Sequence, residues 1–74
     1  MSIEQDGAGR LRKRYADMLR FIGDAKERHI REIEAYMLRN YGLTPKTTAK
    51  YLGWADRYGD IKFLNPARNR VQRI

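Results

Sequence analysis

Apolar residues recur along residues 10–22 at the spacing of one face of an α-helix. The members of this stripe are Leu11, Tyr15, Met18, Leu19 and Ile22. Their intervals match the 3.6-residue period, so we predict a helix over residues 10–22 that ends at Gly23. Residues 1–9 show no such period and contain two glycines, which predicts a flexible arm before the helix.

The helical period returns in the next segment. Its apolar positions are Ile30, Ile33, Tyr36, Met37 and Tyr41. We therefore predict a second helix over residues 31–41, ended by Gly42, which adopts the left-handed backbone conformation at little cost. The polar connection before this helix leaves room for a very short strand over residues 28–30.

A third helix is predicted over residues 45–58 by signals at both ends. Thr44 is a favourable N-cap because its hydroxyl can accept a hydrogen bond from a backbone N–H of the first turn. Pro45 suits the first helical position, and Gly59 ends the helix. The residues expected to point inward are Thr48, Leu52, Ala55 and Tyr58.

The period changes after the third helix. Ile61 and Phe63 alternate with polar residues, and a turn-rich cluster over residues 65–69 precedes a second alternating stretch. This pattern predicts a β-hairpin over residues 60–74 with a basic tip. The chain should therefore form one mainly α domain with a small β-hairpin.

This order of elements, and several short motifs within it, resemble the winged helix-turn-helix domains of prokaryotic, especially archaeal, transcription regulators. The motifs are Gly42-Leu43-Thr44-Pro45, Thr47-Thr48, Tyr51-Leu52 and Gly59-Asp60-Ile61. The resemblance covers residues 10–74 and implies a three-helix winged helix-turn-helix domain that binds DNA. Thr48 stands where such domains usually have an aliphatic residue, and Ala55 where they usually have leucine. These departures predict a thin core beneath the third helix.

The charge of the chain favours a polyanionic partner. Its 74 residues carry a formal net charge of +7, and residues 38–74 hold eight Lys and Arg but only two acidic residues, Asp56 and Asp60. A one-sided positive field attracts nucleic acid and speeds the encounter with it. The alternative is a generically basic small protein.

Other functional classes find little support in the composition. The chain has no cysteine, and His29 is its single histidine, so we expect no disulfide, no metal and no cofactor. No paired carboxylates, activated nucleophile or glycine-rich phosphate loop suggests an enzyme. No apolar run is long enough for a membrane span, and we expect a cytoplasmic, nucleoid-associated protein.

In a winged helix-turn-helix domain the third helix enters the major groove, and the hairpin, or wing, contacts the backbone or the minor groove. We expect DNA contacts from the start of that helix, from two aromatic residues on it and from cations of the hairpin. These residues are Thr44, Lys46, Thr47, Lys50, Tyr51, Trp54, Lys62, Arg68, Arg70 and Arg73. Arg68 is the favoured wing contact because the turn should project it. The alternatives are an ordinary solvated helix face, a soluble edge strand, and packing of Trp54 on the wing.

A second basic cluster lies at the start of the first predicted helix. It consists of Arg10, Arg12, Lys13 and Arg14. These side chains could hold flanking phosphates, and a solvated helix end is the alternative. Like charges at a helix N-terminus oppose the helix dipole, which an anionic partner would relieve.

We predict a double-stranded DNA-binding protein that regulates transcription and forms a homodimer through the apolar stripe of residues 10–22. A protein-interaction module of a replication, segregation or transcription complex is the alternative that keeps the fold. A non-specific nucleoid-associated binder is the alternative that rests on charge alone. We expect no small-molecule effector.

Overall fold

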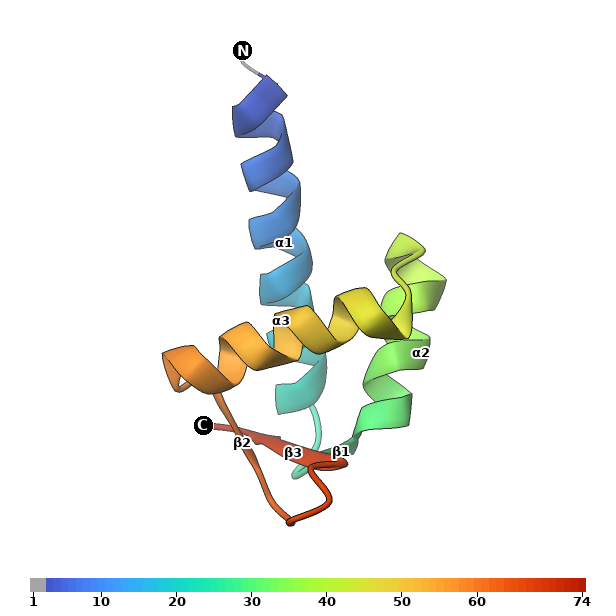
Figure 1. The fold of residues 1–74 in the computed structure, drawn as a ribbon, viewed down its shortest axis with the longest axis vertical. Coiled ribbons are helices and arrows are strands. Elements are labelled where there is room, and N and C mark those ends of the chain that lie inside the picture. Colours follow the sequence, from blue (N-terminus) through green and yellow to red (C-terminus); the bar gives the residue numbers. More distant parts are fainter. Residues whose placement is uncertain (1–2) are drawn as a thin grey trace.

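Three helices and a three-stranded antiparallel sheet make up the fold (Figure 1). The computed structural model describes the backbone of residues 3–74 and the side chains of residues 9–74. The elements, in chain order, are α1 (Ile3–Gly23), β1 (Arg28–His29), α2 (Ile30–Tyr41), α3 (Pro45–Tyr58), β2 (Ile61–Phe63) and β3 (Arg70–Arg73). The mainly helical class and the small hairpin are therefore confirmed.

Helix α1 begins at Ile3 rather than at Arg10. The predicted arm of residues 1–9 is wrong from Ile3 onward, and residues 1–2 lie outside the described chain. Extending an existing helix adds one hydrogen bond per residue, whereas starting one is costly. The packed part of α1 therefore starts the helix, which can then extend towards the N-terminus through a polar segment whose apolar residues show no helical period. The first turns of α1 project beyond the other elements (Figure 1).

Local signals set the ends of α2 and α3 as predicted, within one residue. The side chain of His29 caps α2 by accepting a hydrogen bond from the backbone N–H of Arg31 at 3.1 Å. Gly42 ends α2 with a left-handed φ of 68°. Thr44 caps α3, since its Oγ1 accepts a hydrogen bond from the backbone N–H of Thr47 at 3.3 Å. Only residues 42–44 separate the two helices.

The sheet joins the hairpin to the segment before α2. Strand β3 lies between β1 and β2, and both pairings are antiparallel. Val71 is the Cα partner of Arg28 on one side and of Phe63 on the other. The short strand allowed over residues 28–30 therefore forms at Arg28–His29, and it anchors the start of α2 to the hairpin.

The core is formed where all three helices meet the sheet. Its buried apolar members are Met18, Leu19, Ile22, Ile33, Met37, Tyr51, Leu52, Ala55, Ile61 and Val71. Thr48 is fully buried among them, as its position on the third predicted helix required. The apolar stripe of α1 is thus largely used by the protein's own core.

Two predictions about the inner face of α3 are wrong. Tyr51, expected at the DNA surface, is only 4% exposed, whereas Tyr58, expected to point inward, is 72% exposed. Tyr51 lies one turn after Thr48 and one turn before Ala55, on the side of α3 that faces α1 and α2. Tyr58 lies on the last turn and packs edge-on against Tyr15, with ring centroids 6.4 Å apart.

A carboxylate on α1 holds α2 through two tyrosines. Tyr41 donates a hydrogen bond to Asp17 Oδ2 at 2.6 Å, and Tyr36 donates to the same carboxylate at 2.9 Å. Arg20 pairs with Asp17 at 2.5 Å. The hydrogen bond from Tyr41 is the main reason that the pKa of Asp17 lies below its ordinary value. The same hydrogen bond, with burial, raises the pKa of Tyr41 to about 12.

Replacing Tyr41 by phenylalanine is expected to lower the free energy of unfolding at neutral pH by about 1 kcal/mol, because a charge-assisted hydrogen bond is lost from a partly exposed site. The folded pKa of Tyr41 lies above its ordinary value of 10.0, so its contribution is complete below pH 10.0 and is lost as the pH rises to about 12. The pKa of Asp17 is lowered from 3.8, so its contribution is present above pH 3.8 and is lost on acidification. Urea unfolding over a pH series measures both effects.

Tyr58→Phe is the matched control for this measurement. Its hydroxyl forms no hydrogen bond with any described residue, so removal of the hydroxyl should leave the stability unchanged. The difference in the free energy of unfolding between Tyr41→Phe and the parent protein should shrink between pH 10 and about 12. A difference that stays constant across this range would contradict the assigned hydrogen bond.

Candidate nucleic-acid interface

The outward face of α3 carries three exposed cations in line. Lys46, Lys50 and Arg57 are separated by four and seven residues, which places them on one side of the helix. Thr48 and Ala55 are buried on the opposite side. None of the three cations forms an ion pair with a described side chain. We call Lys46, Lys50 and Arg57 the α3 basic face.

Sequence reasoning missed Arg57. Its spacing of seven residues from Lys50 already matched the helical period, so a search for further cations on the face of Lys46 and Lys50 would have found it. Between the cations this face carries only the small residues Ala49 and Gly53. The backbone of α3 is therefore accessible there to a large partner.

The two threonines at the start of α3 are engaged with each other. Thr44 Oγ1 accepts from the backbone N–H of Thr47, and the two hydroxyl oxygens lie 3.2 Å apart. Thr47 is half-buried and lies at the edge of the α3 basic face, while Thr44 is exposed. Their predicted contacts with bases and phosphates stay predictions.

The two aromatic residues expected at the interface take different positions. Tyr51 belongs to the core, so its predicted DNA contact is corrected. Trp54 is half-buried and stacks on Tyr51, with ring centroids 5.2 Å apart. The groove that Trp54 lines is otherwise formed by Leu11, Arg12 and Tyr15 of α1 and by Tyr58 of α3, and none of these residues belongs to the hairpin.

The hairpin arginines contact the protein itself. Arg68 has a φ of 56° in the turn, as a projecting tip residue would, but its guanidinium pairs with Asp56 of α3 at 3.3 Å. It also lies 4.2 Å from the ring centroid of Phe63. The side chain therefore bends back instead of projecting from the turn. Exposed ion pairs of this kind contribute at most about 1 kcal/mol, so a phosphate can compete for Arg68.

Of the remaining hairpin cations, two contact acidic residues in the described part of the chain and one does not. Arg70 pairs with Glu27 at 3.0 Å. Arg73 donates to the backbone carbonyl of Asp60 at 2.7 Å and lies 3.6 Å from the Asp60 carboxylate. Lys62 is exposed and forms no ion pair with a described side chain. Of the four cations predicted for the hairpin, Lys62 is thus the one available without exchange of a partner.

The four cations at the start of α1 do not share one face. Arg14 lies 5.6 Å from the ring centroid of Tyr41 on α2. Arg12 lines a groove that faces α3, and Arg10 and Lys13 are exposed. The structure therefore places Arg12 across a groove from Trp54 and Tyr58 of α3, and the contacts of these four cations with flanking phosphates stay predictions.

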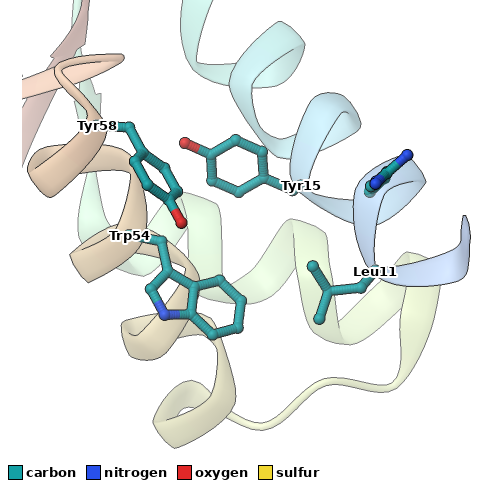
Figure 2. Close-up of a pocket in the computed structure, with 5 residues that line it drawn as sticks. Leu11, Tyr15, Trp54 and Tyr58 are labelled. Carbon is teal, nitrogen blue, oxygen red and sulfur yellow. The ribbon is translucent and has the colours of Figure 1, made fainter. Parts of the chain in front are cut away.

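An aromatic groove separates the exposed half of α1 from the end of α3 (Figure 2). Its volume is about 520 Å³, and its lining residues are Leu11, Arg12, Tyr15, Trp54 and Tyr58. Tyr15 donates a hydrogen bond to Asp60 Oδ2 at 2.6 Å. Burial and this hydrogen bond raise the pKa of Tyr15 well above its ordinary value, so its hydroxyl remains protonated. The groove borders the α3 basic face on the side of α1.

The described residues show neither a metal site nor a membrane helix. No group of three or more His, Asp or Glu side chains among them could hold a metal ion. No described helix is both long and apolar enough to cross a membrane. Comparison with known proteins adds no relative, since no family model, curated protein or solved structure matches this chain.

Substitution of Gly53 by alanine is expected to raise the free energy of unfolding by about 1 kcal/mol, because glycine weakens a helix interior by about that amount relative to alanine. A Cβ at this position meets no atom within 4 Å, so alanine introduces no clash. Gly42→Ala is the control: it also has open space, but its φ of 68° strains any L-residue. Thermal unfolding should show opposite shifts for the two variants, and shifts of the same sign would contradict the interpretation.

Proposed function

We propose that this chain is a winged helix-turn-helix domain that binds double-stranded DNA, with α3 in the major groove. The single observation that carries this proposal is the α3 basic face, where three cations that form no ion pair with a described side chain lie opposite the buried side of the helix. A recognition helix requires this combination, since one side must hold it in the domain while the other meets the groove.

The arrangement around α3 supports the same proposal. Residues 42–44 form the turn between α2 and α3, and the β2–β3 hairpin follows α3 directly, as a wing does. Lys62 is exposed on β2, on the face of the hairpin opposite to the buried Ile61, and we assign it to a separate phosphate contact. We assign the cations to phosphate contacts and to guanine edges, and the hairpin to the adjacent backbone or minor groove.

The role we propose for this binding is regulation of transcription. The proposed homodimer has less apolar surface than the sequence suggested, because Met18, Leu19 and Ile22 are buried within one molecule. Leu11 is 40% exposed and remains available from that stripe.

Titration of a labelled blunt duplex of random sequence with the protein tests the proposal. Fluorescence anisotropy should report binding at low salt. The logarithm of the association constant should fall linearly with the logarithm of salt concentration. Engagement of three or four cations predicts a slope of about −3 to −4. Absence of binding at about 50 mM salt would refute the proposal, since non-specific phosphate contacts are strong under that condition.

Selection of bound sequences from a random pool of duplexes then separates regulation from packaging. A regulator should enrich one motif, because direct readout distinguishes base pairs by about 1–3 kcal/mol for each good contact. A pool that binds but stays random would indicate a non-specific nucleoid-associated protein instead.

A further inference from the structure

The groove between α1 and α3 is lined mainly by aromatic and apolar side chains. Trp54 and Tyr58 line it from α3, and Leu11 and Tyr15 line it from α1. Figure 2 shows Trp54 and Leu11 on opposite sides of the open space. Tyr58 is 72% exposed and Leu11 is 40% exposed, so the protein itself leaves these side chains uncovered. Such a surface suits a flat aromatic group.

The charge around the groove indicates an anionic occupant. Among the described side chains that line it, Arg12 is the charged one, and none is acidic. On α3, Lys50 precedes Trp54 by four residues and Arg57 follows it by three, so both cations lie beside the groove. The Asp60 carboxylate accepts a hydrogen bond from Tyr15 and pairs with Arg73, so it is already engaged.

These charges argue against a second copy of the chain as the occupant. An α1 helix from another molecule would bring its own Arg10, Arg12, Lys13 and Arg14 to a groove that is already rimmed by cations. Like charges placed side by side oppose association. A nucleotide, in contrast, supplies an aromatic ring and a negative charge together, as stacking sites for single strands require.

We propose that the groove binds one unpaired nucleotide of a DNA strand, with its base among Trp54, Tyr58 and Leu11 and its phosphate on Arg12. This inference rests on the proposed function, because α3 holds the adjoining duplex. The protein would then favour duplex ends, gaps or forks, where a base is free to leave the stack. It deepens the role of Trp54, which would contact a base rather than the sugar-phosphate backbone.

The test compares three labelled versions of one duplex. The first has blunt ends, the second has a single-stranded overhang of three nucleotides, and the third has the same overhang without its bases. The overhang should strengthen binding by at least about fivefold, the lower limit expected for one stacked base. The abasic overhang should lose this gain. Trp54 is the only tryptophan, so its fluorescence should be quenched by the overhang and not by the blunt duplex.

Substitutions in the groove give the second readout. Tyr58→Ala and Leu11→Ala change exposed side chains and should remove the gain while leaving affinity for the blunt duplex unchanged. Arg12→Gln should reduce the gain, and Arg10→Gln, an equal charge change at an exposed position two residues away, should not.

The outcomes separate the two proposals. Equal affinity for the blunt and overhang duplexes would overturn the nucleotide site and leave the proposed function standing. An abasic overhang that retained the full gain would also overturn it, since phosphate alone would then explain the effect. Binding of the overhang without binding of the blunt duplex would support the groove and overturn the proposed function. Failure to bind either ligand would overturn both.

Discussion

Replacing Lys50 and Arg57 together by alanine is expected to weaken binding to duplex DNA about 30-fold at physiological salt. Each cation that neutralises a phosphate contributes about 0.9 to the slope of log K against log salt, so the loss of two makes the slope shallower by about 1.8. At about 0.15 M salt this difference corresponds to about 30-fold. Both side chains are exposed and form no ion pair with a described residue, so the fold should be unaffected.

The matched control replaces Lys26 and Arg39 by alanine. This pair also comprises one lysine and one arginine, both exposed and without an ion pair among the described side chains, and neither lies on α3. The control protein has the same net charge as the first variant, so a general electrostatic effect would weaken both equally. The affinity of both variants for DNA is measured by anisotropy over a salt series. Equal losses of affinity would show that the α3 basic face does not contact DNA.

Replacing Thr48 by valine is expected to raise the free energy of unfolding by about 1–3 kcal/mol. Thr48 is fully buried, and its Oγ1 has no hydrogen-bond partner among the described residues. A buried polar atom without a partner costs that amount, and valine has nearly the same shape. A chain of this size has a net stability of only about 3–5 kcal/mol. The midpoint of thermal unfolding should therefore rise by about 4–8 °C for each kcal/mol gained.

Thr47→Val is the control for this substitution. Thr47 lies one position earlier on the same helix, but its hydroxyl is hydrogen-bonded to that of Thr44. Its removal should bring no gain. A Thr48→Val protein no more stable than the parent would show that the hydroxyl of Thr48 is satisfied by water or by a carbonyl in solution.

Thr48 also illustrates why the predicted inner face of α3 was only partly correct. The spacing of apolar residues predicted that Thr48, Leu52 and Ala55 point inward, and all three are buried. Tyr51 and Tyr58 are seven residues apart and so lie on the same flank of that stripe, and periodicity cannot decide how far along that flank another helix covers it. The packing of α1 against α3 covered Tyr51 and left the last turn, with Tyr58, in solvent.

The candidate site also has features that the sequence predicts and features that only tertiary contacts decide. The spacing of Lys46 and Lys50 was sufficient to predict an exposed basic face. Arg57 fits the same helical period, although the sequence analysis did not include it. The contact of Arg68 with Asp56 was not predictable, because it joins the hairpin turn to a residue of α3 12 positions earlier. The same holds for Arg70 with Glu27. The sequence shows where the cationic side chains are. Whether such a side chain is free to bind DNA depends on which carboxylates the fold places next to it.

By itself, the sequence determined the number and order of the helices, the Thr44 cap, the glycines that end α2 and α3, and the presence of a hairpin, because these depend on short-range hydrogen bonds and on the period of apolar residues. It also determined the sign of the charge on α3. Only the tertiary structure decided which side of each helix is covered, which arginines are paired, and that α1 and α3 enclose an aromatic groove. These properties arise from contacts between distant segments, whose geometry no local pattern specifies.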